Sequence, residues 1–212
     1  MSNPTAHILL ENSIISLVKG KPVRFKSGIL SPVYVDNRKL SSYPKAWRQI
    51  IVALSRMIKE KKINFDVIAG IESAAIPHSA ALSFFMKKPS VFVRKEIKVH
   101  GLQKRVEGMN VSGKKVLLIE DTISTGGSSI SGIMALREEG AIVTDCISIV
   151  NYNFPEVMPK FKKARVKIYS LVSFIDVISE AVDLKYFSKK EGTEISIWLK
   201  NPHIWSNAHE EK

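Results

Sequence analysis

Apolar residues along the chain follow two alternating patterns, which together predict an α/β fold. Short, nearly continuous apolar runs of strand length occur at residues 65–69, 90–93, 116–119, 142–150 and 166–172. Such runs are typical of strands that are buried on both faces of a parallel sheet. Segments rich in small and apolar residues between these runs predict helices over 74–86 and 128–139. The alternation therefore predicts a central, mainly parallel sheet within residues 63–173, flanked by helices.

The chain before this sheet is expected to form two helices joined by an extended segment. Apolar positions with helical spacing run through residues 5–18 and stop before Gly20 and Pro22. A second helix is expected over 44–60, with a proline in its first turn. Between the two helices the chain reads as extended, with a short strand over 33–35.

Two further segments do not fit the alternation. Residues 96–112 keep neither a helical nor a strand period, and a loop of that length between core elements is usually functional or disordered, so we expect a mobile lid there. Residues 185–205 are amphipathic, and Trp198 and Trp205 lie on the apolar side. This helical segment is expected to pack on the domain or on a second subunit.

Composition indicates one globular domain over residues 1–212 that attracts anions. The chain has 32 Lys and Arg against 20 Asp and Glu, a formal net charge of +12, and the excess gathers in residues 1–62 and 87–105. Nucleic acid, an acidic membrane or a small phosphorylated substrate would all respond to such a field. For Lys59, Lys61, Lys62 and the lysines of 160–167, a solubilising surface is the simpler interpretation. The chain has a single cysteine, no leader-like start and no long apolar window. These features favour a cytoplasmic protein that is not associated with membranes.

The stretch Val116–Ser129, VLLIEDTISTGGSS, carries the most specific chemistry. A buried strand ends in the acid pair Glu120 and Asp121, followed by a turn rich in glycine and hydroxyl groups and then by a helix N-terminus. Backbone N–H groups of such a turn bind a monophosphate, and the helix dipole favours the anion. The acids suit ribose hydroxyls or a shared magnesium ion. The stretch lacks the Lys-Ser/Thr of a P-loop and the spaced glycines of a dinucleotide fingerprint.

These features in this order resemble the phosphoribosyl-pyrophosphate motif of type I phosphoribosyltransferases. Two other segments resemble the orotate phosphoribosyltransferases within that family: FKSGILSPVYVDNR at 25–38, and VRKEIKVHG at 93–101. The resemblance covers most of residues 20–150. It implies the type I fold, with residues 1–40 as a small N-terminal hood and 96–112 as a flexible catalytic loop. It also implies magnesium-dependent transfer of a phosphoribosyl group from phosphoribosyl pyrophosphate to N1 of orotate, giving orotidine 5′-phosphate and pyrophosphate in pyrimidine synthesis.

The same resemblance implies the site residues. The expected catalytic residues are Lys98 and Asp121. The expected substrate-binding residues are Lys26, Tyr34, Arg94, Lys95, Lys98, His100, Glu120, Asp121, Thr122, Ile123, Ser124, Thr125, Gly126, Gly127 and Ser128. Arg94, Lys95, Lys98 and His100 would act on the pyrophosphate in the site of the neighbouring subunit of a homodimer. Magnesium would be held by the diphosphate of the substrate and by water, without an assigned protein ligand.

Two departures from the family pattern bear on the bound groups. Ser73 and Ala74 stand where some members carry a Tyr-Lys pair, and no arginine follows the fourth core strand near Tyr152. Transfer to a purine or uracil is therefore one alternative, although a carboxylated base better explains a cation at Lys26. The other alternative is a nucleic-acid-binding regulator that senses phosphoribosyl pyrophosphate, motivated by the charge of +12. No appended nucleic-acid module supports it.

Overall fold

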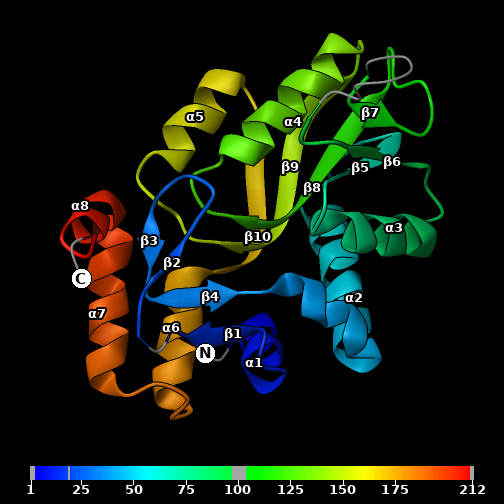
Figure 1. The fold of residues 1–212 in the computed structure, drawn as a ribbon. Coiled ribbons are helices and arrows are strands. Elements are labelled where there is room, and N and C mark those ends of the chain that lie inside the picture. Colours follow the sequence, from blue (N-terminus) through cyan, green and yellow to red (C-terminus); the bar gives the residue numbers. More distant parts are fainter. Residues whose placement is uncertain (1–2, 19, 97–103, 211–212) are drawn as a thin grey trace.

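The fold is described by a computed structural model over residues 3–18, 20–96 and 104–210. Its centre is a six-stranded sheet in the order β10-β9-β8-β5-β6-β7 (Figure 1). The strands are β5 (Val67–Ile71), β6 (Ser90–Val93), β7 (Val106–Glu107), β8 (Lys115–Ile123), β9 (Ile142–Asn151) and β10 (Lys167–Ser173). All neighbouring pairs are parallel except β6 and β7. The predicted α/β class with a mainly parallel sheet is confirmed.

The order of the strands determines which face of the sheet each helix covers. The chain moves from β5 to β6 in one direction along the sheet and from β8 through β9 to β10 in the other. Because parallel crossovers are right-handed, α3 (Ala75–Met86) packs on one face, while α4 (Gly127–Glu138) and α5 (Val157–Ala164) pack on the other (Figure 1). The direction reverses between β5 and β8. The carboxyl ends of strands diverge at such a point and leave a crevice for a ligand.

The N-terminal segment differs in part from its prediction. The first helix, α1 (Pro4–Glu11), ends well before Val18, and the chain continues as β1 (Ile15–Leu17). Ser13 has a φ of 52°, which turns the chain out of the helix, and β1 then pairs antiparallel with β4 (Val33–Val35). The apolar residues around Ile15 satisfy both a helical and a strand period, so the pattern did not locate this turn.

The rest of the hood follows the prediction closely. The hood has a hairpin of β2 (Val23–Arg24) and β3 (Leu30–Ser31), then β4 and the short 3₁₀ helix η1 (Asn37–Ser42). The second predicted helix is confirmed as α2 (Pro44–Glu60), which buries an apolar face that includes Ile50 and Leu54.

The C-terminal helices support the hood. They are α6 (Phe174–Asp183), which the sequence analysis did not predict, α7 (Lys189–Lys200) and α8 (Pro202–Asn207). Trp198 is fully buried, and its Nε1 donates a hydrogen bond of 2.9 Å to the carbonyl of Leu30; the N–H of Leu30 donates to Ser206 Oγ over 2.9 Å. Phe25, Tyr152 and Phe154 surround the Trp198 ring. This segment therefore packs on its own chain.

The segment predicted as a lid, residues 96–112, includes residues that belong to the edge of the sheet. Residues 97–103 lie outside the described residues, but β7 falls inside the predicted lid and pairs with β6. The N–H of Arg94 donates to the carbonyl of Arg105 over 2.8 Å, and Val111 is fully buried. The chain from 104 onward is thus joined to the sheet edge. A two-residue strand is too short to show a period in the sequence.

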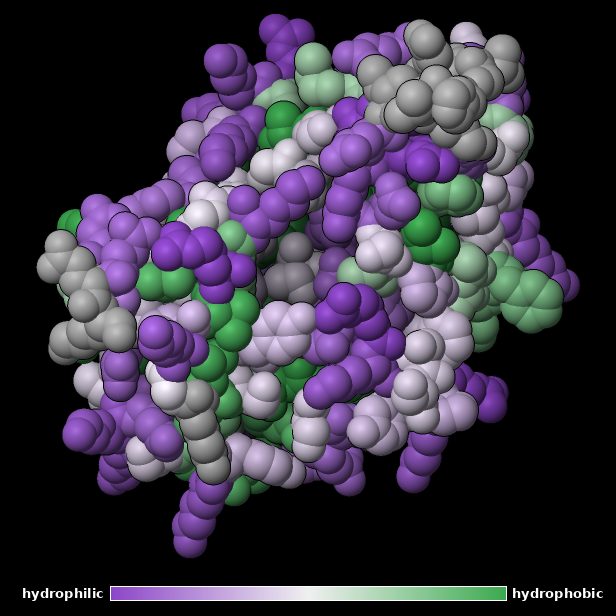
Figure 2. All heavy atoms as spheres, in the orientation of Figure 1, coloured by the Kyte–Doolittle hydropathy of each residue, from purple (hydrophilic) through white to green (hydrophobic). Residues whose placement is uncertain are grey.

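Hydrophilic residues predominate on the face drawn in Figure 2, which is hollowed between the hood and α4. Within the described ranges, the helices are too short or too polar to cross a lipid bilayer.

Candidate active site

The acid pair lies at the end of β8, beside the reversal point of the sheet. Glu120 is 6% exposed, and its Oε2 accepts a hydrogen bond of 3.3 Å from Ser129 Oγ at the start of α4. Burial, and then the negative charge of Asp121, raise the pKa of Glu120 well above its ordinary range. Asp121 is less buried and accepts a hydrogen bond of 3.2 Å from Thr122 Oγ1. The pair therefore offers one buried carboxyl, Glu120, that retains its proton more readily, beside the more exposed carboxyl of Asp121.

The turn between β8 and α4 is shaped to approach an anion closely. Gly126 has a φ of 74°, a conformation that L side chains avoid, and it is the N-cap of α4. A Cβ at this position would lie 3.0 Å from Cε2 of Phe161. From the far side, Lys160 Nζ donates to the carbonyl of Thr125 over 2.8 Å. These contacts hold the turn so that the helix N-terminus and its N–H groups face the crevice.

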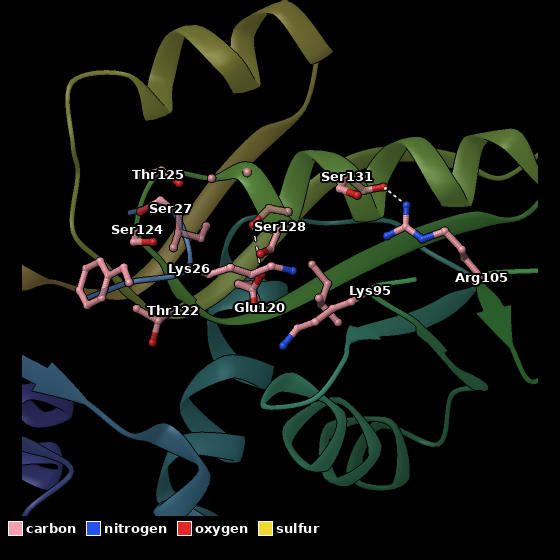
Figure 3. Close-up of a pocket in the computed structure, with 16 residues that line it drawn as sticks. Lys26, Ser27, Lys95, Arg105, Glu120, Thr122, Ser124, Thr125, Ser128 and Ser131 are labelled. Carbon is pink, nitrogen blue, oxygen red and sulfur yellow. Dashed lines mark hydrogen bonds between the residues drawn. The ribbon is translucent and has the colours of Figure 1, made fainter. Parts of the chain in front are cut away.

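Two adjoining pockets occupy the crevice. The inner pocket, about 330 Å³, lies over the turn and is lined by residues 122–129 together with Phe25, Lys26, Ser27, Ile71, Lys95, Arg105, Glu120 and Ser131. Figure 3 shows Lys26, from the β2–β3 hairpin, and Lys95, from the end of β6, approaching Glu120 from two directions. Arg105 Nη1 donates to the carbonyl of Ser131 over 3.3 Å. Three cations therefore stand around a cradle of N–H and hydroxyl groups.

The outer pocket, about 260 Å³, lies beside the hood. It is lined by residues 34–36 and 71–74 together with Arg38, Lys95, Glu120, Asp121, Thr122 and Ser128. Because Ile71, Lys95, Glu120, Thr122 and Ser128 line both pockets, the two are connected past the acid pair. A ligand with a monophosphate at one end and a larger anionic group at the other fits this arrangement.

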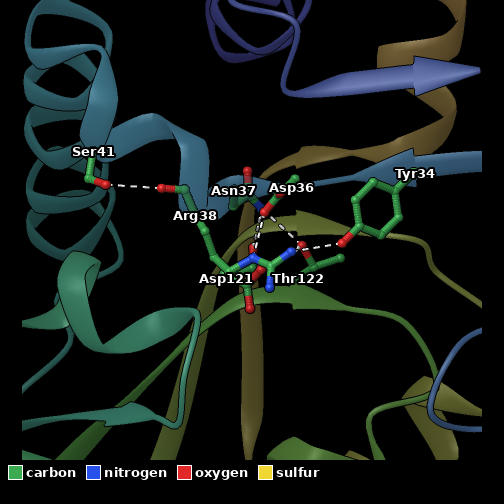
Figure 4. A network of polar contacts seen from close by, with 7 residues as sticks. All are labelled: Tyr34, Asp36, Asn37, Arg38, Ser41, Asp121 and Thr122. Atoms are coloured by element: carbon green, nitrogen blue, oxygen red, sulfur yellow. Dashed lines mark hydrogen bonds and ion pairs between the residues drawn. The ribbon is translucent and has the colours of Figure 1, made fainter.

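A polar network joins the hood to the end of β8 (Figure 4). Asn37 is fully buried, and its Nδ2 donates to the carbonyl of Asp121 over 3.1 Å and to Thr122 Oγ1 over 2.9 Å. Arg38 donates from Nε to Asp36 Oδ1 over 2.6 Å and from Nη2 to the hydroxyl of Tyr34 over 2.8 Å. The hood thus fixes the backbone of the acid pair and places an arginine beside it.

Comparison with known proteins decides the family. The family model "Phosphoribosyl transferase domain" matches residues 38–187. A protein of Coxiella burnetii named orotate phosphoribosyltransferase is 38% identical over 200 residues, which are 94% of this chain and 96% of that protein. The chain belongs to the phosphoribosyltransferase family. The predicted class of enzyme, a pentosyl-transferring glycosyltransferase, is therefore confirmed at the level of the family.

Solved phosphoribosyltransferase structures share the fold. The UMP synthase of Leishmania donovani superposes with a TM-score of 0.80 at 23% identity, over 92% of this chain but only 41% of that longer one. The orotate phosphoribosyltransferase of Aeropyrum pernix superposes with a TM-score of 0.74 at 22% identity, over 86% of this chain and 99% of that one.

Most of the predicted phosphoribosyltransferase site residues lie together in the two pockets. Lys26, Tyr34, Lys95 and every predicted residue from Glu120 to Ser128 line one pocket or both. Arg94 lines neither pocket, and its Nη1 lies 3.6 Å from Glu107 Oε1. Lys98 and His100 lie outside the described residues.

The structure also adds residues to this phosphoribosyltransferase site that the sequence analysis missed. Asn37 and Arg38 end the FKSGILSPVYVDNR stretch, so their place in that motif was the available signal. Arg105 carried only the signal of a basic residue inside the predicted lid, residues 96–112. Among the described residues, no group of three or more His, Cys, Asp or Glu side chains is arranged to hold a metal ion.

Proposed function

We propose that the chain transfers the 5-phosphoribosyl group of phosphoribosyl pyrophosphate to N1 of orotate, giving orotidine 5′-phosphate and diphosphate. The observation that carries this proposal is the continuity of the two pockets past Glu120 and Asp121, with an anion cradle in one and room for a diphosphate in the other. The names of the curated relatives, at 35–38% identity over nearly the whole chain, support the same reaction.

Each part of the substrate has a suitable surface in this arrangement. The 5′-phosphate fits the turn from Thr122 to Ser128, where N–H groups and the dipole of α4 favour an anion. The ribose hydroxyls lie against Glu120 and Asp121, which accept hydrogen bonds. Lys26, on the hairpin over the inner pocket, offers a cation for the orotate carboxylate. Ser124, which lines the inner pocket, and Tyr34, which lines the outer pocket, would contact the base.

The chemistry requires positive charge near the leaving group. Loss of diphosphate from the anomeric carbon leaves positive charge on the sugar and adds negative charge to the departing oxygens, so fixed cations stabilise the transition state. Lys95 lines both pockets and suits this role. Arg94, Lys98 and His100 would add charge from the loop of a neighbouring subunit in a homodimer, and closure of that loop would exclude water.

Magnesium fits the donor set as a partner of the substrate. Asp121, at the end of β8, lines the outer pocket, and a carboxylate with water and diphosphate oxygens is a usual environment for this ion. When bound, Mg²⁺ would neutralise the diphosphate. We place the reaction in the cytoplasmic synthesis of pyrimidine nucleotides, without a membrane or nucleic-acid partner.

The direct test mixes the purified protein with Mg²⁺, phosphoribosyl pyrophosphate and orotate and follows the loss of orotate absorbance. Uracil and hypoxanthine serve as parallel acceptors. Consumption of orotate alone supports the proposal, whereas consumption of another base alone would replace it with the first alternative. Binding of phosphoribosyl pyrophosphate without any turnover, together with salt-dependent binding of RNA or DNA, would favour the regulator.

Lys98→Ala tests the predicted catalytic loop. Because the pyrophosphate would lose one cation in the transition state, we expect kcat to fall by about 100-fold or more, as for the loss of one donor to a developing anion. Lys59→Ala, at an exposed lysine near the end of α2, is the matched control and should leave kcat unchanged. Equal turnover in the two variants would remove Lys98 from the mechanism.

A further inference from the structure

On its β5 side, the described residues that line the outer pocket include no cation. The turn after β5 presents Ser73 and Ala74, which carry no charge. The neighbouring Glu72 is acidic, and its Oε2 accepts a hydrogen bond of 3.0 Å from the N–H of Lys95. If the proposed reaction is correct, a second cation beside Lys95 would help to bind the diphosphate in this pocket.

Arg38 lies on the opposite wall of the same pocket. It is the second residue of the 3₁₀ helix η1, which follows β4, and 55% of its side chain is exposed. Figure 4 shows its guanidinium between the hood and the end of β8 that bears Asp121. Two of its three nitrogens are fixed, Nε by Asp36 and Nη2 by the hydroxyl of Tyr34, and the Asp36 carboxylate raises the pKa of Arg38.

The third nitrogen of Arg38 is available to a ligand. Within the described part of the chain, Nη1 has no hydrogen-bond partner. A guanidinium has a planar set of donors that matches adjacent phosphate oxygens, and prior fixation of the side chain reduces the entropy lost on binding. An arginine held in this way is better suited to orient a diphosphate than a freely rotating surface lysine.

The charges around the outer pocket also limit what it accepts. Arg38 and Lys95 face three acids, Asp36, Glu72 and Asp121, while the fourth acid, Glu120, retains its proton more readily. A bare diphosphate would meet a wall with more acids than bases. A magnesium complex of diphosphate carries less negative charge, so the pocket suits the complex better.

We propose that Arg38 binds the diphosphate group of magnesium-bound phosphoribosyl pyrophosphate from within its own subunit, in the pocket that it shares with the uncharged Ser73–Ala74 turn. Asp36 and Tyr34 are positioning residues that hold the guanidinium toward the pocket. This inference rests on the proposed function and adds a residue to it.

Isothermal titration in excess Mg²⁺ tests the inference with two ligands that differ only in the diphosphate: phosphoribosyl pyrophosphate and ribose 5-phosphate. For Arg38→Gln we expect the affinity for phosphoribosyl pyrophosphate to fall by about 10- to 100-fold, the range expected for a hydrogen bond to a charged group. Affinity for ribose 5-phosphate should stay unchanged. Arg38→Lys should recover part of the loss. Arg48→Gln, at an exposed arginine of α2, should behave as wild type.

The other outcomes distinguish failure of this inference from failure of the proposed function. Equal binding of phosphoribosyl pyrophosphate by wild type and Arg38→Gln would overturn the inference and leave the proposed function intact. A similar loss for both ligands would also overturn it, because Arg38 would then only hold the hood in place. A raised KM for orotate with unchanged binding of phosphoribosyl pyrophosphate would assign Arg38 to the base instead. If wild type binds neither ligand, the proposed function fails first.

Asp36→Asn tests the positioning role through the same pair of ligands. Because the guanidinium would be less firmly held, binding of phosphoribosyl pyrophosphate should weaken by a smaller factor than in Arg38→Gln, with ribose 5-phosphate and the Tm unchanged. A fall in Tm with both affinities reduced equally would show a structural role only, and this would contradict the assignment of Asp36.

Discussion

Replacing Gly126 by alanine tests the shape of the anion cradle. Gly126 combines a φ of 74° with a position against the Phe161 ring, where an added Cβ would lie 3.0 Å from Cε2. Its carbonyl also accepts the first hydrogen bond of α4, from the N–H of Ile130 over 3.0 Å. The substitution therefore disturbs the backbone conformation and the packing of the turn together.

The two effects have different magnitudes. Alanine in the left-handed region costs about 1–2 kcal/mol relative to glycine. Overpacking against a buried ring costs about 1–3 kcal/mol more, depending on how far Phe161 can shift. The two costs together are about 2–5 kcal/mol. For a chain of this length, about 1 kcal/mol corresponds to about 2–4 °C in Tm, so we expect Gly126→Ala to lower the Tm by about 4–20 °C.

Gly113→Ala provides the matched control. Gly113 has a φ of 72°, close to that of Gly126, but nothing lies within 4 Å of the Cβ that would be added. It should show the backbone cost alone, a fall of about 2–8 °C. Differential scanning calorimetry of both variants and wild type measures the difference. Titration with phosphoribosyl pyrophosphate should show an affinity at least about tenfold lower in Gly126→Ala, because the N–H donors of the turn move, and wild-type affinity in Gly113→Ala.

Two results would refute this reasoning. If both variants lost the same Tm, the contact with Phe161 would carry no packing cost. If Gly126→Ala lost stability but bound phosphoribosyl pyrophosphate as wild type does, the turn from Ser124 to Gly127 would not be the anion cradle.

Two further predictions concern the acid pair. Burial and the charge of Asp121 raise the pKa of Glu120 above 4.5 in the folded protein. The neutral carboxyl of Glu120 therefore stabilises the folded state fully below about pH 4.5, and this stabilisation is lost as the pH rises through the pKa of the folded state. Urea unfolding from pH 4 to 8 should thus show Glu120→Gln gaining stability relative to wild type as pH rises, and a constant difference would contradict the raised pKa. Asn37→Ala should lose about 1–3 kcal/mol in the same assay, since two buried hydrogen bonds to Asp121 and Thr122 disappear. A loss below about 0.5 kcal/mol would show that the hood does not depend on them.

The sequence predicted the sheet well because burial on both faces makes a local signal. Ser90–Val93 matches β6 fully, and the run from Ile142 matches β9 to within one residue. The signal was ambiguous where few residues carry it, as in β1 and β7. The helix α6 was missed although Ser173 caps it and accepts a hydrogen bond from the N–H of Asp176, because its apolar stripe directly follows an apolar strand.

The candidate site also has some residues that the sequence predicted and others that it did not. The acid pair and the glycine turn are consecutive, so their order in the sequence sufficed to place them at the end of a strand and the start of a helix. Asn37 and Arg105, in contrast, form hydrogen bonds with residues far away in the chain. The partners of Asn37, Asp121 and Thr122, are 84 and 85 residues away, and the partner of Arg105, Ser131, is 26 residues away. The type of residue alone does not indicate such contacts, because asparagine and arginine are common on any surface.

These distant contacts make the C-terminal helices part of the site, although they contribute no residue to either pocket. Trp198 and Ser206 hold both backbone groups of Leu30, and Leu30 pairs with Arg24 at the base of the hairpin that carries Lys26. On the other side of the hood, Asn37 holds the backbone of the acid pair. The position of Lys26 over Glu120 therefore depends on packing at α7 and α8 as much as on the sheet. Substitutions that loosen these helices should weaken binding in the inner pocket before they unfold the core, because Trp198 and Ser206 hold the hairpin that carries Lys26.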